Sequence, residues 1–115
     1  TTNSDLRNDY GIIRVFRGES AIDTGLLKAG CFIGDHAKTA IGTLLNTGTV
    51  VGTFANWFEP GLSPKEIPPF CRGHTGRQRL EDILYTCRQM MSRRGCVPGP
   101  AYIALLTNLY ENSRL

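Results

Sequence analysis

The chain has 115 residues, of which 41% are hydrophobic and 20% charged, a composition ordinary for one globular domain or part of one. Thirteen basic and ten acidic residues give a formal net charge of +3, which is too mild for a dedicated nucleic-acid binder. No apolar run approaches the roughly 20 residues that span a bilayer, and no signal peptide is visible. We therefore expect no membrane partner, no nucleic-acid partner and a cytoplasmic location.

The four cysteines do not indicate a metal site, because they contain no CxxC pair and only two histidines could complete a ligand set. Cys31 and Cys87 fall at apolar positions of their segments, where a thiol behaves as a small buried hydrophobic group. We expect reduced thiols and no metal in this chain.

The segment 1–23 predicts an irregular start followed by a hairpin. The chain begins at Thr1 without an initiator Met and opens on polar residues, as expected of a piece of a longer protein. Residues 12–16 alternate apolar and polar side chains, residues 17–20 are typical of a turn, and residues 21–23 of a returning strand. This hairpin insertion at about 11–23 either reaches a neighbouring subunit or a substrate, or has no function of its own.

A six-residue period runs through residues 27–58. The first position of each hexad is usually large: Leu27, Ile33, Thr39, Leu45, Val51 and Trp57. The fifth position is always small: Cys31, Ala37, Thr43, Thr49 and Ala55. This period fits neither a helix nor simple strand alternation, and it predicts a mainly β fold with a few coils of parallel β-helix within residues 1–58. Turn conformations with positive φ are expected at four glycines: Gly34, Gly42, Gly48 and Gly52.

Residues 59–74 are predicted to form an irregular connector, because residues 60–69 contain four prolines. Residues 75–115 are predicted to form a helical cap of two α-helices that covers one end of the coils. For the first helix, we expect Thr75 as N-cap and Gly95 as the glycine that ends it. The buried face of the second helix is expected to hold Tyr102, Leu105, Leu106 and Leu109. The arginines around the first helix indicate a solvated surface or an anion site for phosphate groups.

Residues 30–52, GCFIGDHAKTAIGTLLNTGTVVG, resemble the hexapeptide-repeat domain of bifunctional sugar nucleotidyltransferases. The family is that of UDP-N-acetylglucosamine pyrophosphorylase/glucosamine-1-phosphate acetyltransferase, and the chain is similar to its putative sugar-nucleotide transferase relatives. The further matching segments are residues 3–11, 22–26, 33–38, 44–49 and 64–70. The resemblance thus covers most of the chain.

The resemblance implies a left-handed parallel β-helix that forms a homotrimer, with an acetyl-CoA site between subunits and an amino-sugar phosphate as acceptor. It also implies that a nucleotidyltransferase domain precedes the coils, so these residues cannot transfer a nucleotidyl group. The family's catalytic histidine lies on an earlier coil, before Thr1. Coenzyme and substrate contacts carry over to Asn3 and Thr43, and we add Asn46 and Thr47 as side chains that would line the groove between coils.

His36 is the one histidine in the hexads and is a candidate general base, although it does not match the family's catalytic position. The alternative is a surface or subunit-contact histidine. Three functions remain open: part of an acyl-CoA-dependent amino-sugar-phosphate acetyltransferase, a non-catalytic trimerisation or regulatory module of a sugar-1-phosphate nucleotidylyltransferase, and an anion or nucleic-acid binder through the arginines. Whether the chain is itself an enzyme stays open.

Overall fold

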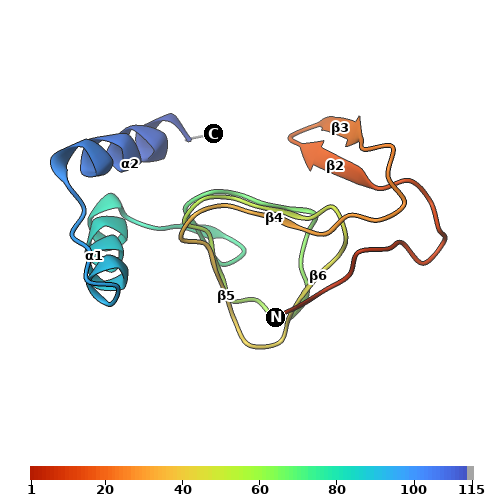
Figure 1. Cartoon of the computed structure of the whole chain (residues 1–115), viewed down its shortest axis with the longest axis horizontal. Helices are drawn as coiled ribbons and strands as arrows, with labels where there is room; N and C mark the ends of the chain where they lie inside the picture. The colour runs from red at the N-terminus through yellow and green to blue at the C-terminus, as the bar shows by residue number, and fades with distance from the viewer. Residues whose placement is uncertain (114–115) are drawn as a thin grey trace. The chain divides into compact units, whose positions relative to one another are not determined.

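The computed structural model describes residues 1–113 and divides into two compact units, Thr1–Gly76 and Arg77–Leu115. The first unit is built from strands and corners, and the second from helices (Figure 1). The elements in chain order are β1 (Thr2–Asn3), β2 (Arg14–Arg17), β3 (Ser20–Asp23), β4 (Phe32–Ile33), β5 (Lys38–Thr39), β6 (Thr43–Leu45), β7 (Val50–Val51), β8 (Asn56–Trp57), β9 (Gly61–Leu62), β10 (Glu66–Ile67), β11 (Cys71–Arg72), β12 (Gly76–Arg77), α1 (Leu80–Ser92) and α2 (Pro100–Asn112).

Apart from the β2–β3 hairpin, the strands form three ladders with the orders β4-β7-β10, β5-β8-β11-β12 and β1-β6-β9. From β4 to β9, partners in neighbouring parallel strands are separated by three hexads, as in the pairs Phe32 and Val50, Lys38 and Asn56, and Thr43 and Gly61. Successive hexads therefore occupy the three ladders in turn. In Figure 1, β4, β5 and β6 lie on three sides of the winding backbone of the first unit, and the backbone of later residues follows the same course. The left-handed parallel β-helix itself stays a prediction.

The core of the first unit lies inside the middle coil. Leu45, Val51 and Trp57, which hold the first hexad position, are 3%, 1% and 5% exposed. In contrast, Leu27 and Ile33 hold the same position but are 52% and 60% exposed. Ile33 is exposed because β4 is an edge strand of its ladder, so the Ile33 side chain has neighbours on one side only.

The expected irregular connector at 59–74 is wrong, because β9, β10 and β11 lie within it. Gly61 pairs with Thr43, Glu66 with Val50 and Arg72 with Asn56, so the segment continues all three ladders. The four prolines all fall between strands, at residues 60, 64, 68 and 69. Proline is tolerated there because these four positions lie outside the paired strand residues, whose N–H groups form the ladders. The coils therefore continue beyond residue 58, and the boundary between the units follows Gly76.

Two of the four hexad glycines serve a different purpose from the predicted one. Gly42 and Gly48 have φ of +85° and +80°, as expected, but Gly34 and Gly52 are not in the left-handed region. A Cβ on Gly34 would lie 2.6 Å from a backbone nitrogen of the next coil, and a Cβ on Gly52 would lie 2.3 Å from the nitrogen of Pro69. These two positions need glycine because neighbouring coils approach each other closely at this corner.

The predicted hairpin is confirmed, since β2 and β3 pair antiparallel along their whole length. Ile13 at its base is fully buried, and its N–H donates to the carbonyl of Leu26 at 3.0 Å. At the tip, the N–H of Gly18 donates to both carboxylate oxygens of Glu66, at 3.1 and 3.2 Å. Because Glu66 belongs to β10, this contact holds the tip of the hairpin against the coils.

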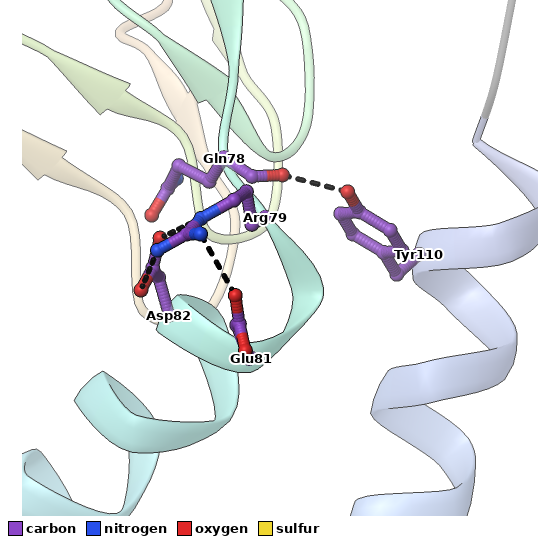
Figure 2. A network of polar contacts seen from close by, with 5 residues as sticks. All are labelled: Gln78, Arg79, Glu81, Asp82 and Tyr110. Atoms are coloured by element: carbon purple, nitrogen blue, oxygen red, sulfur yellow. Dashed lines mark hydrogen bonds and ion pairs between the residues drawn. The ribbon is translucent and has the colours of Figure 1, made fainter.

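Helix α1 begins later than predicted. Its N-cap is Arg79, and Thr75 lies in the turn before β12, so the predicted cap is wrong. Acidic side chains in the first turn bind the Arg79 guanidinium instead: Asp82 accepts from Nε at 2.9 Å, and Glu81 lies 2.9 Å from Nη1 (Figure 2). The end of the helix is confirmed, because Gly95 has φ of +69° and follows the last turn.

Helix α2 begins with Pro100 in its first turn, as a proline-initiated helix does. Its buried residues are Leu106 and Tyr110, whereas Leu105 and Leu109 are 56% and 44% exposed, which corrects the predicted face. The hydroxyl of Tyr110 donates to the carbonyl of Gln78 at 2.7 Å (Figure 2), and the Arg77 guanidinium lies 3.8 Å from the centre of the same ring. Neither helix in residues 1–113 is long and apolar enough to cross a membrane.

Candidate functional site

A polar cavity of about 560 Å³ opens in the first unit, where the chain leaves β1. Its walls come from three segments that are distant in sequence: the residues after β1, the corner between β6 and β7, and the corner between β9 and β10. The lining residues are Ser4, Leu6, Arg7, Asn8, Asp9, Asn46, Thr47 and Lys65. All of these except Leu6 carry polar or charged side chains, so the cavity suits a polar ligand.

Lys65 lies on a cavity wall formed by the corner between β9 and β10, which is shorter than the corner between β6 and β7. Gly61 pairs with Thr43, a full three hexads earlier in the chain. Glu66 pairs with Val50, and this separation falls two positions short of three hexads. The corner before β10 is therefore shorter than the one before β7. Lys65 lies in this short corner, and its Nζ donates a hydrogen bond to a main-chain carbonyl of the longer corner.

The opposite wall is fixed by backbone hydrogen bonds to β6 and to the corner that follows it. The N–H of Ser4 donates to the carbonyl of Leu45 at 3.1 Å, and the N–H of Thr47 donates to Oγ of Ser4 at 3.1 Å. These two contacts hold the start of the 4–9 segment against the corner that contains Asn46 and Thr47.

The base of the hairpin closes the site beside Gly48. A Cβ on Gly48 would lie 2.7 Å from the carbonyl oxygen of Arg14, 2.9 Å from a side-chain carbon of Ile13 and 3.1 Å from Nζ of Lys65. Any larger residue here would therefore push against the hairpin and against Lys65. The predicted insertion is thus part of the structure around the cavity.

A carboxylate in the cavity already holds one of the two lining cations. Oδ1 and Oδ2 of Asp9 accept from Nε and Nη2 of Arg7 at 3.0 and 2.8 Å, and Oδ1 also accepts from the N–H of Gly11 at 2.9 Å. The Gly11 N–H, and then Arg7, lower the pKa of Asp9, so it remains a carboxylate. Asp9 takes only part of the fork of donors on Arg7, which leaves N–H groups for a ligand.

The ammonium of Lys65 is the second cation. Partial burial lowers its pKa, and the charge of Arg7 lowers it further. Cys31 lies nearby, and its Sγ donates to the carbonyl of Asn46 at 3.5 Å. Burial raises the pKa of this thiol, so Cys31 is held in its neutral form beside the lysine.

Two of the residues predicted from the sequence, Asn46 and Thr47, line the cavity. Thr47 is 2% exposed, and its hydroxyl has no hydrogen-bond partner among residues 1–113. Asn3 is exposed and does not line the cavity. It pairs with Leu45, the residue that directly precedes Asn46.

Thr43 does not lie where its predicted coenzyme contact requires. Its side chain is fully buried inside the coil, as is that of Thr49. Neither hydroxyl has a hydrogen-bond partner among the residues that the structure describes. Thr43 occupies the small fifth position of its hexad, where the coil interior leaves room for few atoms, and this packing explains why the side chain points inward.

His36 lies at a different corner, between β4 and β5, and is not among the residues that line the cavity. Its φ is +60°, and the equivalent corner residues of the next coils, Phe54 and Phe70, have φ of +58° and +59°. The three side chains form a column: ring centroids are 4.8 Å apart for His36 and Phe54, and 6.2 Å apart for Phe54 and Phe70. This position gives His36 a packing role at the corner.

Six lining residues were not predicted as site residues from the sequence: Ser4, Leu6, Arg7, Asn8, Asp9 and Lys65. Lys65 was missed because the six-residue register breaks in front of it. The available signal was the spacing of Ile67 and Cys71, which follow Val51 and Ala55 by two positions less than three hexads. Aligning these pairs reveals a third coil with a short corner, and that corner contains Lys65.

The cysteines form no disulfide within residues 1–113. Cys71 and Cys87 are buried, Cys31 is half-buried, and Cys96 is exposed. The expected burial of Cys87 is confirmed. In the same part of the chain, no group of three or more His, Cys, Asp and Glu side chains is placed to hold a metal ion.

No model of a known protein family matches the chain, and neither a curated protein nor a solved structure matches it. The similarity to sugar nucleotidyltransferases therefore rests on the sequence motifs. The geometry of the cavity is an independent observation about function.

Proposed function

We propose that the chain is the β-helix portion of a sugar-phosphate nucleotidyltransferase-like protein, and that the cavity binds the phosphate group of its ligand. In this proposal the three ladders wind into a short left-handed parallel β-helix. The observation that carries the proposal is the presence of Arg7 and Lys65 in one polar cavity, surrounded by amide and hydroxyl side chains.

The chemistry of the lining residues suits a phosphate ester. A guanidinium binds phosphate oxygens through paired N–H groups, and an ammonium adds a point charge. The side chains of Asn8 and Asn46 supply neutral donors at the same cavity. A phosphate group suits the cavity better than a carboxylate because it offers more acceptor oxygens, which Arg7, Lys65 and the neutral donors can share.

Two sources of phosphate follow from the family resemblance, an amino-sugar phosphate and acetyl-CoA. Acetyl transfer to the amine would also need a general base in reach of it. His36 packs in the corner column away from the cavity walls, so we assign the site a binding role and do not propose His36 as the base.

Calorimetric titration of glucosamine 1-phosphate and of acetyl-CoA, in separate experiments, tests the proposal. At least one of them is expected to bind at low salt. Lys65→Met and Arg7→Gln should each weaken binding roughly tenfold or more, because hydrogen bonds to charged groups contribute about 1.5–3 kcal/mol. Lys38→Met is the matched control, since Lys38 lies outside the cavity. Absence of binding for both ligands, or equal weakening by Lys38→Met, would exclude the proposed site.

A second function, the trimerisation module, is favoured by an apolar row on the outside of the coils. Leu44 pairs with Leu62 across β6 and β9, and these side chains are 43% and 60% exposed. Light scattering should then give the mass of a trimer, and Leu62→Lys should reduce it to that of a monomer. Val97→Lys, at an 87% exposed site in the helical unit, should leave the trimer intact. A wild-type monomer would rule this function out for the isolated chain.

A further inference from the structure

Lys65 combines three features that are not explained by phosphate binding alone. Its amine lines a cavity, is tied to one defined acceptor, and lies beside a group that would hold an anion. The chain contains two further lysines, Lys28 and Lys38, and neither lines the cavity. The residue is therefore set apart by position as well as by chemistry.

We propose that Lys65 is a nucleophilic amine that forms a Schiff base with phosphorylated aldehydes. The inference rests on the proposed function, because Arg7 and the neighbouring amides would hold the phosphate while the aldehyde reaches the amine. The proposed ligands do not include sugar 1-phosphates, since phosphorylation at the first carbon prevents the ring from opening to an aldehyde. An aldose phosphate with its phosphate at another carbon opens to a free aldehyde.

The reaction needs no redox partner. The lone pair of the Lys65 nitrogen forms a bond to the aldehyde carbon, and the carbonyl oxygen leaves as water with the two hydrogens of the amine. A C=N double bond remains. The hydrogen bond from Nζ to the carbonyl of Thr47 uses one N–H and orients the amine. The nitrogen lone pair then stays available for carbon.

The environment of Lys65 favours the form of the amine that reacts. Only the neutral amine is a nucleophile, and desolvation is one route by which proteins activate lysines. Partial burial and the charge of Arg7 lower the pKa of Lys65 and so enlarge the neutral fraction near neutral pH.

Pyridoxal 5′-phosphate and its amine analogue, pyridoxamine 5′-phosphate, test the inference on the complete chain. The first carries an aldehyde and a phosphate, and the second carries the phosphate without an aldehyde. Adducts are trapped with borohydride, which reduces the C=N bond to a stable amine, and the labelled lysine is located by peptide mass spectrometry. Because the chain has three lysines, each can be scored separately.

We expect most of the label on Lys65, loss of that label in Lys65→Arg, and no change in Lys38→Arg. Pyridoxal without its phosphate should label Lys65 far less, and pyridoxamine 5′-phosphate should protect it. If pyridoxamine 5′-phosphate binds but the label spreads evenly over the three lysines, the Schiff-base inference is overturned while the phosphate site stands. If the amine analogue does not bind at all, both proposals fail together.

Discussion

The imidazole ring of His36 packs on the ring of Phe54, with the two centroids 4.8 Å apart and the planes inclined by 33°. Both residues have positive φ, a conformation that is uncommon for residues other than glycine and that histidine adopts more often than most. The corner therefore keeps two residues of uncommon backbone conformation whose rings pack together at a tilt. This relationship explains the presence of a histidine in the repeats without a catalytic role.

If His36 serves packing, an aromatic replacement should preserve the protein. His36→Phe is expected to retain the free energy of unfolding and the affinity for phosphate esters, because the ring column is kept. His36→Ala should lose about 1 kcal/mol, the usual contribution of an aromatic pair. Urea denaturation of both variants measures the difference. Loss of ligand binding in a fully folded His36→Phe would contradict this assignment.

The close approach of coils at Gly52 predicts a large effect from one methyl group. In Gly52→Ala the Cβ would lie 2.3 Å from the nitrogen and 2.6 Å from Cα of Pro69, both backbone atoms. The coils must separate, at a cost of about 2 kcal/mol or more. Gly30→Ala is the control, because its Cβ would meet its nearest atom, Nδ2 of Asn3, at an ordinary 3.9 Å. Equal stability of the two variants in thermal unfolding would argue against stacked coils.

Burial of Cys71 predicts how stability changes in alkali. Desolvation raises the pKa of this thiol above its ordinary value of 9.0. In the unfolded chain the thiol ionises near its ordinary pKa, so above that pH the folded state binds more protons than the unfolded state, and the free energy of unfolding falls as pH rises. Cys71→Ala should make this decline shallower, whereas replacement of the exposed Cys96 should not. Denaturation curves at neutral and alkaline pH check the slope.

The Tyr110 hydroxyl ties the second helix to the start of the helical unit. Tyr110→Phe removes the 2.7 Å hydrogen bond to Gln78 but keeps the ring that Arg77 covers. We expect a loss of about 1 kcal/mol in the helical unit, because the carbonyl of Gln78 loses its donor. Tyr85→Phe, at a 64% exposed position, is the control and should have little effect. Far-UV circular dichroism during thermal unfolding compares the two variants.

The hexad pattern predicted the middle coil well because the large and small positions there are filled without interruption. Val51, Trp57 and Ala55 are all buried, as their positions require. The same pattern did not show which coil is the edge, and Ile33 is exposed although its residue type suits the core. Residue type indicates whether a side chain points into the coil, but the burial of that side chain depends on whether another coil covers it.

The candidate site was harder to predict because it depends on an interruption of the repeat. Asn46 and Thr47 were found, since they lie in a corner of the regular register. Lys65 was missed because the four prolines near it are typical of an irregular connector, whereas here they occupy corners of a further coil. Thr43 was assigned to the coenzyme through the family resemblance, whereas its side chain is buried inside the coil, without a hydrogen-bond partner among the described residues.

The most direct test of the phosphate site is a heteronuclear NMR titration of the chain with glucosamine 1-phosphate, and then with inorganic phosphate. We predict that the largest amide shifts fall on the cavity walls, at Asn8, Asn46, Thr47 and Lys65, with little change at the His36 corner. Shifts confined to the arginine-rich helical unit, or no shifts at concentrations that saturate ordinary phosphate sites, would contradict this prediction.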